Sequence, residues 1–173
     1  WPVQGEKEQL YFRGATNLDA TLDELFSAKG LGRATEVVVS GSSAGGLATF
    51  LHLDHIAERV KGVAPSVKVH GAPIVGYFLD HATFDLDPDS YTARMAYVYG
   101  MQSLATSGVL TQACLKTFST APHRCFMSPH MWQFIKTPFY VFNSKFDAWQ
   151  LQNELMLPSW RSPAELAAVL GYG

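Results

Sequence analysis

The clearest indication of the fold is Glu36-Val37-Val38-Val39-Ser40-Gly41-Ser42-Ser43-Ala44-Gly45-Gly46. Its first half is a continuous apolar run that ends at a glycine, which is typical of a strand buried on both faces of a parallel sheet. Its second half is rich in glycine and leads into residues 47–61, where apolar positions recur with helical spacing. The stretch therefore predicts a strand, a tight turn and a helix in direct succession.

The segments on either side of this stretch also predict alternating helices and strands. We expect a helix over 17–29, with Asn17 as its cap and Gly30 as its stop. An extended segment over 66–70 is expected to break at residues 71–73 and resume over 74–79. Further along, 90–112 reads as helix, 132–135 as a helical turn and 139–143 as a strand. This alternation predicts an α/β architecture with a mainly parallel sheet and flanking helices, in one domain over 1–173.

The composition excludes several classes of protein. The chain has 173 residues, of which 47% are apolar and 16% charged, so it can build a hydrophobic core. Its net charge is only −2 and its lysines and arginines are scattered, so no nucleic-acid partner is expected. Its apolar runs have strand length, far below the roughly 20 residues of a membrane helix, so no transmembrane segment is expected.

The two cysteines leave two readings open. Cys114 and Cys125 are close in sequence and flank a turn-rich segment. A local disulfide would indicate a secreted protein, whereas two free buried thiols would indicate a reducing compartment. The spacing favours the disulfide but does not decide the matter.

The turn at residues 41–45 has the G-x-S-x-G pattern of a nucleophile elbow. Such a turn needs small residues around its serine because the strand and the helix meet closely there. Ser43 is then the candidate nucleophile, and the amide of Ala44 is a candidate donor to an oxyanion. The alternatives are a phosphate-binding turn or a merely structural turn. Phosphate binding is disfavoured because no lysine follows the glycines and no G-x-G-x-x-G spacing is present.

A serine nucleophile needs a base and an acid that orients this base. Asp147 follows the last expected strand, where the acid of such a triad belongs, but it is equally placed to cap a helix after it. All six histidines precede Asp147, whereas the chain order in α/β hydrolases is serine, acid, histidine. His52 and His55 have a spacing that suits a metal, but no third ligand accompanies them. We therefore expect no metal and no other cofactor, and a catalytic histidine beyond residue 173.

The ordered motifs of the chain resemble those of the pectin acetylesterase family, which includes the Notum carboxylesterases. The resemblance rests on Leu10-Tyr11-Phe12-Arg13-Gly14, residues 41–49, His52-Leu53-Asp54, Tyr77-Phe78-Leu79-Asp80, Cys114 to Phe126, Ile135-Lys136-Thr137-Pro138-Phe139, and residues 143–150. It implies an α/β-hydrolase-like fold, Ser43 as nucleophile, Asp147 as triad acid and a disulfide between Cys114 and Cys125. It also implies secretion and an acyl-enzyme mechanism without a cofactor.

The resemblance implies that residues 1–173 are a partial domain. The oxyanion loop of the family lies before the matched region and its histidine after it, and the chain begins with Trp1 and shows no signal peptide. We therefore expect the fragment by itself to be inactive. Residues 69–76 also depart from the pattern of the plant members, which leaves the substrate open.

The leading function is removal of O-acetyl groups from an extracellular polysaccharide such as pectin. One alternative is hydrolysis of a fatty acyl group from a protein, as in the Notum branch. An alternative of another class is a catalytically inactive homologue that binds a partner.

Overall fold

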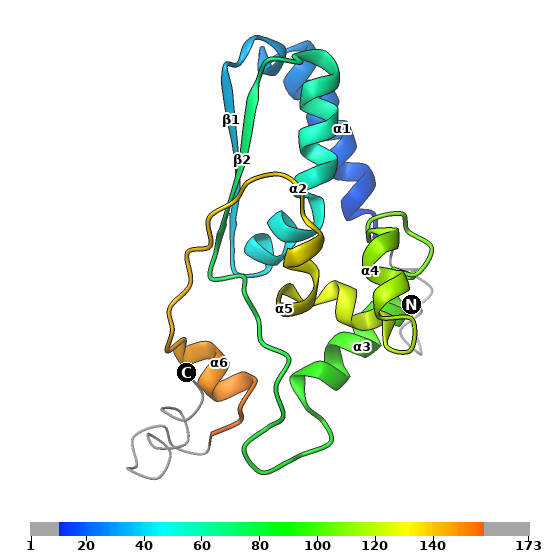
Figure 1. Cartoon of the computed structure of the whole chain (residues 1–173), viewed down its shortest axis with the longest axis vertical. Coiled ribbons are helices and arrows are strands. Elements are labelled where there is room, and N and C mark those ends of the chain that lie inside the picture. The colour runs from blue at the N-terminus through cyan, green and yellow to red at the C-terminus, as the bar shows by residue number, and fades with distance from the viewer. Residues whose placement is uncertain (1–10, 158–173) are drawn as a thin grey trace.

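The computed structural model describes residues 11–157 (Figure 1). Helices and strands alternate through the first half of the described chain, and short helices dominate the second half. The elements are α1 (Gly14–Ser27), η1 (Leu31–Arg33), β1 (Glu36–Ser42), α2 (Ala44–Val63), β2 (Lys68–Ile74), α3 (Tyr91–Met101), α4 (Gln112–Thr117), η2 (Pro122–Phe126), α5 (Ser128–Met131), η3 (Trp132–Phe134) and α6 (Ala148–Asn153).

The sheet is parallel, as the sequence predicts. β1 and β2 pair from Glu36 with Lys68 to Ser42 with Ile74. Residues 139–142 add a third parallel segment, through bridges of Gly71 with Phe139 and of Ile74 with Phe142. Because all three segments run in the same direction, their carboxyl ends lie at one edge of the sheet.

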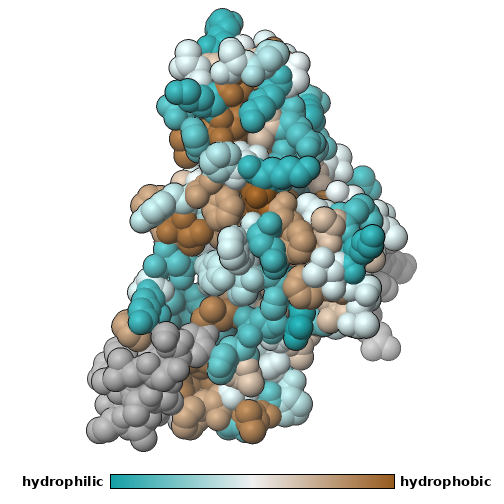
Figure 2. Space-filling view, in the orientation of Figure 1, coloured by the Kyte–Doolittle hydropathy of each residue, from teal (hydrophilic) through white to brown (hydrophobic). Residues whose placement is uncertain are grey.

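α1 and α2 cover one face of the sheet (Figure 1). The core between them includes Leu22 of α1, Val60 of α2 and Val69 of β2, against which Val37 and Val39 of β1 pack. The prediction that β1 is buried on both faces is wrong for the described residues, since Val38 is 59% exposed on the opposite face. Figure 2 shows apolar residues at the molecular surface in the region of these strands.

The observed boundaries correct two expectations near the sheet. α1 begins at Gly14, so Asn17 lies inside the helix instead of capping it, and the carbonyl of Asn17 accepts a hydrogen bond from Thr21. β2 runs through residues 71–73 without a break. Pro73 has no N–H, but its carbonyl accepts from the amide of Phe142, so the proline still takes part in the sheet.

Residues 90–112 do not form the single helix expected from the sequence. α3 ends at Met101 and α4 begins at Gln112. Between them, Ser103 and Gly108 have positive φ values of 51° and 74°, which no right-handed helix contains. Between the two helices, Leu104 and Leu110 are buried in the core.

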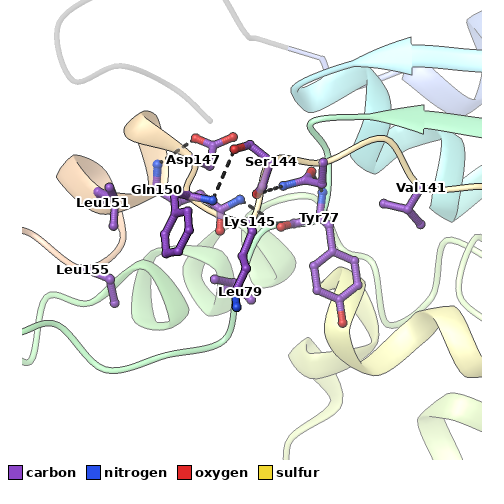
Figure 3. A pocket seen from close by; sticks show the side chains of 11 residues that line it. Tyr77, Leu79, Val141, Ser144, Lys145, Asp147, Gln150, Leu151 and Leu155 are labelled. Carbon is purple, nitrogen blue, oxygen red and sulfur yellow. Dashed lines mark hydrogen bonds between the residues drawn. The ribbon is translucent and has the colours of Figure 1, made fainter. Parts of the chain in front are cut away.

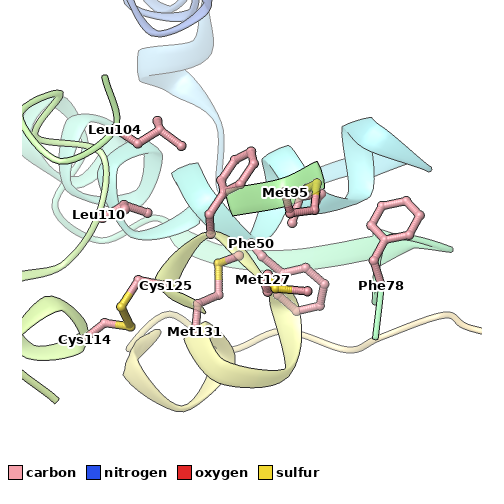
Figure 4. Close-up of a cluster of buried hydrophobic side chains, with 11 residues drawn as sticks. Phe50, Phe78, Met95, Leu104, Leu110, Cys114, Cys125, Met127 and Met131 are labelled. Atoms are coloured by element: carbon pink, nitrogen blue, oxygen red, sulfur yellow. A yellow bond between two sulfur atoms is a disulfide. The ribbon is translucent and has the colours of Figure 1, made fainter. Parts of the chain in front are cut away.

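A second hydrophobic core fills the space beneath the start of α2 (Figure 4). It includes Phe50 of α2, Met95 of α3 and Met127, together with Cys114 and Cys125. The two cysteines form a disulfide, each being 1% exposed, which confirms the disulfide and removes the free-thiol alternative. Among residues 11–157, no helix combines the length and the apolar character that a membrane crossing requires.

We expect replacement of both cysteines by alanine to lower the free energy of unfolding by about 2–3 kcal/mol. The sulfurs link positions 11 residues apart, and a cross-link of this length restricts the unfolded chain. Denaturant titration of the oxidised protein and of the Cys114→Ala/Cys125→Ala variant measures the loss, and reduction of the unmodified protein is the matched control. Equal midpoints for the oxidised protein and the variant would contradict the expectation.

Candidate active site

The turn between β1 and α2 holds Ser43 in a strained backbone conformation. Its φ of 56° and ψ of −121° lie outside the regions that residues with a side chain normally occupy. Two sets of hydrogen bonds fix this conformation: the amide of Ser43 donates to Ile74 O at 2.9 Å, and its carbonyl accepts from Gly46 and Leu47. The side chain of Ser43 is exposed as a result. The turn thus presents a hydroxyl above the carboxyl edge of the sheet.

The glycines of the turn are required by close backbone contacts. A Cβ on Gly41 would lie 2.4 Å from Gly45 O, and one on Gly46 would lie 2.6 Å from Ile74 O and 2.9 Å from Gly76 Cα. Such distances are far below van der Waals contact. Gly45 differs, because a Cβ there would meet open space. The predicted need for small residues is confirmed at positions 41 and 46, and it does not apply to the side chain of residue 45.

The amide of Ala44 is the first of α2, a helix of 20 residues. The first amides of an α-helix have no acceptor within it, and the helix dipole places partial positive charge at this end. Negative charge that develops on an oxygen next to Ser43 can therefore be stabilised by backbone N–H groups that are already oriented. The geometry suits a tetrahedral oxyanion.

Asp147 lies at the same edge of the sheet as Ser43. Ser42 pairs with Ile74, and Ile74 bridges to Phe142, so the three carboxyl ends are level. Ser43 follows its strand directly, and Asp147 comes five residues after Phe142. The tertiary structure therefore brings to one edge two residues that are 104 positions apart in sequence (147 − 43).

Asp147 caps α6, which is one of the two roles that the sequence predicts for it. Its Oδ1 accepts from the amide of Trp149 at 2.9 Å. The same oxygen accepts from the amide of Gln150 at 3.1 Å (Figure 3). Its Oδ2 has no hydrogen-bond donor among residues 11–157. A carboxylate held by one oxygen keeps the other for a further donor, so the cap leaves room for the role of a triad acid.

A cavity of about 400 Å³ lies beside Asp147 (Figure 3). Its wall combines apolar side chains with a few polar groups, which is typical of small-molecule sites. The residues that line it are Tyr77, Leu79, Val141, Asn143, Ser144, Lys145, Phe146, Asp147, Gln150, Leu151 and Leu155.

The histidines of the described chain do not bond to the candidate nucleophile or to the candidate acid. His55 contacts Asp19 of α1 at 2.7 Å, and burial lowers the pKa of His52. Residues 11–157 hold no cluster of three potential metal ligands around this pair or elsewhere. No histidine within residues 11–157 forms a hydrogen bond with Ser43 or Asp147.

A partly buried histidine–aspartate pair was not predicted from the sequence. His130 Nε2 lies 2.6 Å from Asp80 Oδ2, and Thr92 donates to Asp80 Oδ1. Burial by itself would raise the pKa of Asp80, but the hydrogen bonds from Thr92 and His130 and the charges of His130 and Arg124 outweigh it and lower this pKa. The four residues are spread over 50 positions, so no local pattern could have revealed the pair. The hydrogen bonds of Asp80 join the segment after β2 to α3 and α5.

Comparison with known proteins places the chain in a family. The sequence model of the Pectinacetylesterase family matches residues 2–168. Pectin acetylesterase 11 of Arabidopsis thaliana is 35% identical over 150 residues, which cover 85% of this chain and 35% of that protein. Palmitoleoyl-protein carboxylesterase Notum of Drosophila melanogaster is 33% identical over 155 residues, which cover 87% of this chain and 22% of that protein.

A solved structure agrees with the sequence matches. The Wnt deacylase Notum from Drosophila superposes with a TM-score of 0.82 at 27% identity, over 97% of this chain and 48% of that chain. The chain thus spans about a third of the length of the Arabidopsis relative and about half of the Notum chain. The likeness confirms the α/β-hydrolase-like fold. This chain belongs to the pectinacetylesterase family.

Proposed function

We propose that the protein is a serine carboxylic ester hydrolase with Ser43 as its nucleophile. The observation that carries the proposal is the strained turn at Ser43, held by hydrogen bonds to β2 and α2 and sterically dependent on Gly41 and Gly46. A turn that costs about 1–3 kcal/mol of strain has an evident use if it exposes a nucleophile. A homologue that only binds a partner would have no need of it.

The proposed reaction has two steps. Ser43 Oγ attacks the ester carbonyl while a base removes its proton, and the amide of Ala44 stabilises the negative charge on the carbonyl oxygen. The base then protonates the leaving alcohol, and an acyl-enzyme remains on Ser43. Water, activated by the same base, attacks the acyl group and releases the acid. Asp147 orients the base through its Oδ2, since Oδ1 is occupied by the cap of α6.

The base in this proposal is a histidine that follows Asp147 in chain order, beyond residue 173. The order serine, acid, histidine is the one that α/β hydrolases use. No histidine of residues 11–157 bonds to Asp147, which supports this assignment.

The proposed substrate is an O-acetyl ester of an extracellular polysaccharide such as pectin. The 35% identity to a pectin acetylesterase supports this choice. The second candidate is an acylated protein, which the 33% identity to a palmitoleoyl-protein carboxylesterase supports. The Cys114–Cys125 disulfide supports a secreted protein for either substrate, because disulfides persist in oxidising compartments.

Hydrolysis of p-nitrophenyl esters of increasing acyl length, measured on the complete natural polypeptide, tests the function. Preference for acetate supports the polysaccharide substrate, because a small closed pocket rejects longer chains. Preference for chains of eight or more carbons, a length on the order of a fatty acyl group, supports the acyl-protein substrate. Absence of turnover with every ester overturns the proposal in favour of a binding homologue.

A further inference from the structure

Two buried side chains of the α6 segment attach it to the backbone that follows β2. Gln150 Nε2 donates to Tyr77 O at 3.0 Å (Figure 3). Glu154 Oε2 accepts from the amide of Leu79 at 3.1 Å. Gln150 is 5% exposed and Glu154 is 1% exposed. We call Gln150 and Glu154 the α6 clamp. The clamp supplies hydrogen bonds that a neighbouring strand would otherwise give to residues 77–79.

The segment held by the clamp is packed directly against the helix of the Ser43 turn. Gly76 approaches Gly46 so closely that a Cβ on Gly76 would lie 2.4 Å from Gly46 C, and a Cβ on Gly46 would lie 2.9 Å from Gly76 Cα. Ser128 Oγ donates to Gly76 O at 2.8 Å from another side. The contacts therefore run without interruption from Ser43 through α2 and residues 76–79 to the clamp, and from the clamp to Asp147 at the start of α6.

Each side chain of the clamp has one oxygen without a partner among the described residues. These atoms are Gln150 Oε1 and Glu154 Oε1, and both are buried. Two buried unsatisfied acceptors are a costly arrangement. The residues are four positions apart, and the amide of Glu154 donates to Gln150 O, so helical geometry places both side chains on the same face. Because both atoms lack another partner and lie on the same face of the helix, we assign Gln150 Oε1 as the acceptor for a proton on Glu154 Oε1.

The surroundings of Glu154 favour this protonated form. Burial, with a smaller contribution from the negative charge of Asp147, raises the pKa of Glu154 to about 8, although the hydrogen bond from Leu79 opposes the shift. Tyr91 of α3 also faces Glu154, and burial followed by the charge of Glu154 raises the pKa of Tyr91. Arg94 of α3 contacts Met156 but is paired with Asp89. Among residues 11–157, no lysine or arginine forms an ion pair with Glu154 that would compensate its charge.

We propose that Gln150 and Glu154 are positioning residues, which hold Asp147 in register with the Ser43 turn through a proton bound between their Oε1 atoms. The catalytic consequence rests on the proposed esterase function, whereas the clamp itself does not. Loss of this proton would leave two acceptors facing each other and would add a negative charge near Asp147. The hydrogen bonds by which the clamp positions Asp147 are therefore expected to weaken as pH rises through about 8.

Hydrogen exchange tests the clamp without reference to activity. The amides of Trp149 and Gln150 report on the Asp147 cap, since both donate to its Oδ1. We expect their protection factors to fall at least tenfold between pH 6.5 and pH 9 in the unmodified protein. Glu154→Gln should keep protection at both pH values, because its amide group donates to Gln150 and its oxygen accepts from Leu79.

Two further variants complete the exchange experiment. Glu154→Leu should lose protection of Trp149 and Gln150 at both pH values, while Gln152→Leu, on the exposed side of the same helix, should match the unmodified protein. The clamp is overturned if Glu154→Gln loses as much protection as Glu154→Leu. It is equally overturned if the carboxyl carbon of Glu154 titrates near 4.5 by NMR.

Kinetics on the complete natural polypeptide then test the link to catalysis. We expect Glu154→Gln to match the unmodified enzyme at pH 7 and to retain its kcat above pH 8, where the unmodified enzyme loses activity. Glu154→Leu should lower kcat at least tenfold with little change in KM. Altered exchange with unchanged kcat overturns the positioning role. Absence of Ser43-dependent hydrolysis, together with the expected exchange, refutes the esterase function and supports the clamp as a structural device.

Discussion

Replacement of Ser43 by alanine is expected to lower kcat for ester hydrolysis by a factor of about 10⁴–10⁶, the range seen when the nucleophile of a serine hydrolase is removed. Alanine removes the only atom that can form the acyl-enzyme. It retains the Cβ and therefore the backbone strain at φ 56°. Steady-state kinetics on the complete natural polypeptide measure the loss, and thermal unfolding checks that the variant is folded.

Ser43→Gly is the matched control for the strain. Glycine is equally unable to form an acyl-enzyme, but it adopts positive φ without steric cost. We expect it to be as inactive as Ser43→Ala and more stable by about 1 kcal/mol. Turnover that survives both substitutions would show that Ser43 is not the nucleophile. Equal stability of the two variants would show that the turn is not strained.

Asp147→Asn is expected to lower kcat by about 10⁴ while leaving α6 intact, by analogy with the loss of the acid in other serine hydrolases. Asparagine still accepts the amides of Trp149 and Gln150 at the start of the helix, because it caps helices as well as aspartate does. It does not orient or stabilise a protonated histidine. The variant therefore separates the two roles that the sequence leaves open for Asp147, and kinetics with thermal unfolding measure each.

Asp147→Ala completes this comparison. Alanine removes the cap as well as the carboxylate, so we expect the same loss of kcat and an additional loss of about 1 kcal/mol in stability. If Asp147→Asn retains most of the activity, the residue is a helix cap alone. Equal stability of the asparagine and alanine variants would instead mean that the cap contributes nothing.

The elbow was predictable because its requirements are local. A valine run, a turn of small residues and a helical period are all contained in residues 36–61, and the steric need for Gly41 follows from contacts within the same turn. The disulfide was favoured for a similar reason, since Cys114 and Cys125 lie 11 positions apart. Short sequence separation makes such contacts readable from a single chain.

Other predictions were wrong where distant contacts override local preference. Gly71 and Pro73 suggested a break in the strand, but the carbonyl of Pro73 accepts from Phe142 and Gly71 packs against Leu53 and Phe139. Both partner segments, α2 and residues 139–142, are remote in sequence. The burial of Val38 was overestimated because burial depends on which elements cover each face of the sheet.

Sequence patterns were sufficient to predict the parallel α/β class, the position of Ser43 between a strand and a helix, and the resemblance to one family. Folding was needed to show that Asp80 pairs with His130 and that Gln150 and Glu154 bind residues 77–79. The reason is physical. Turn sterics and helical periodicity act between neighbours in the chain, whereas burial, pKa shifts and side-chain hydrogen bonds depend on groups that only folding brings together.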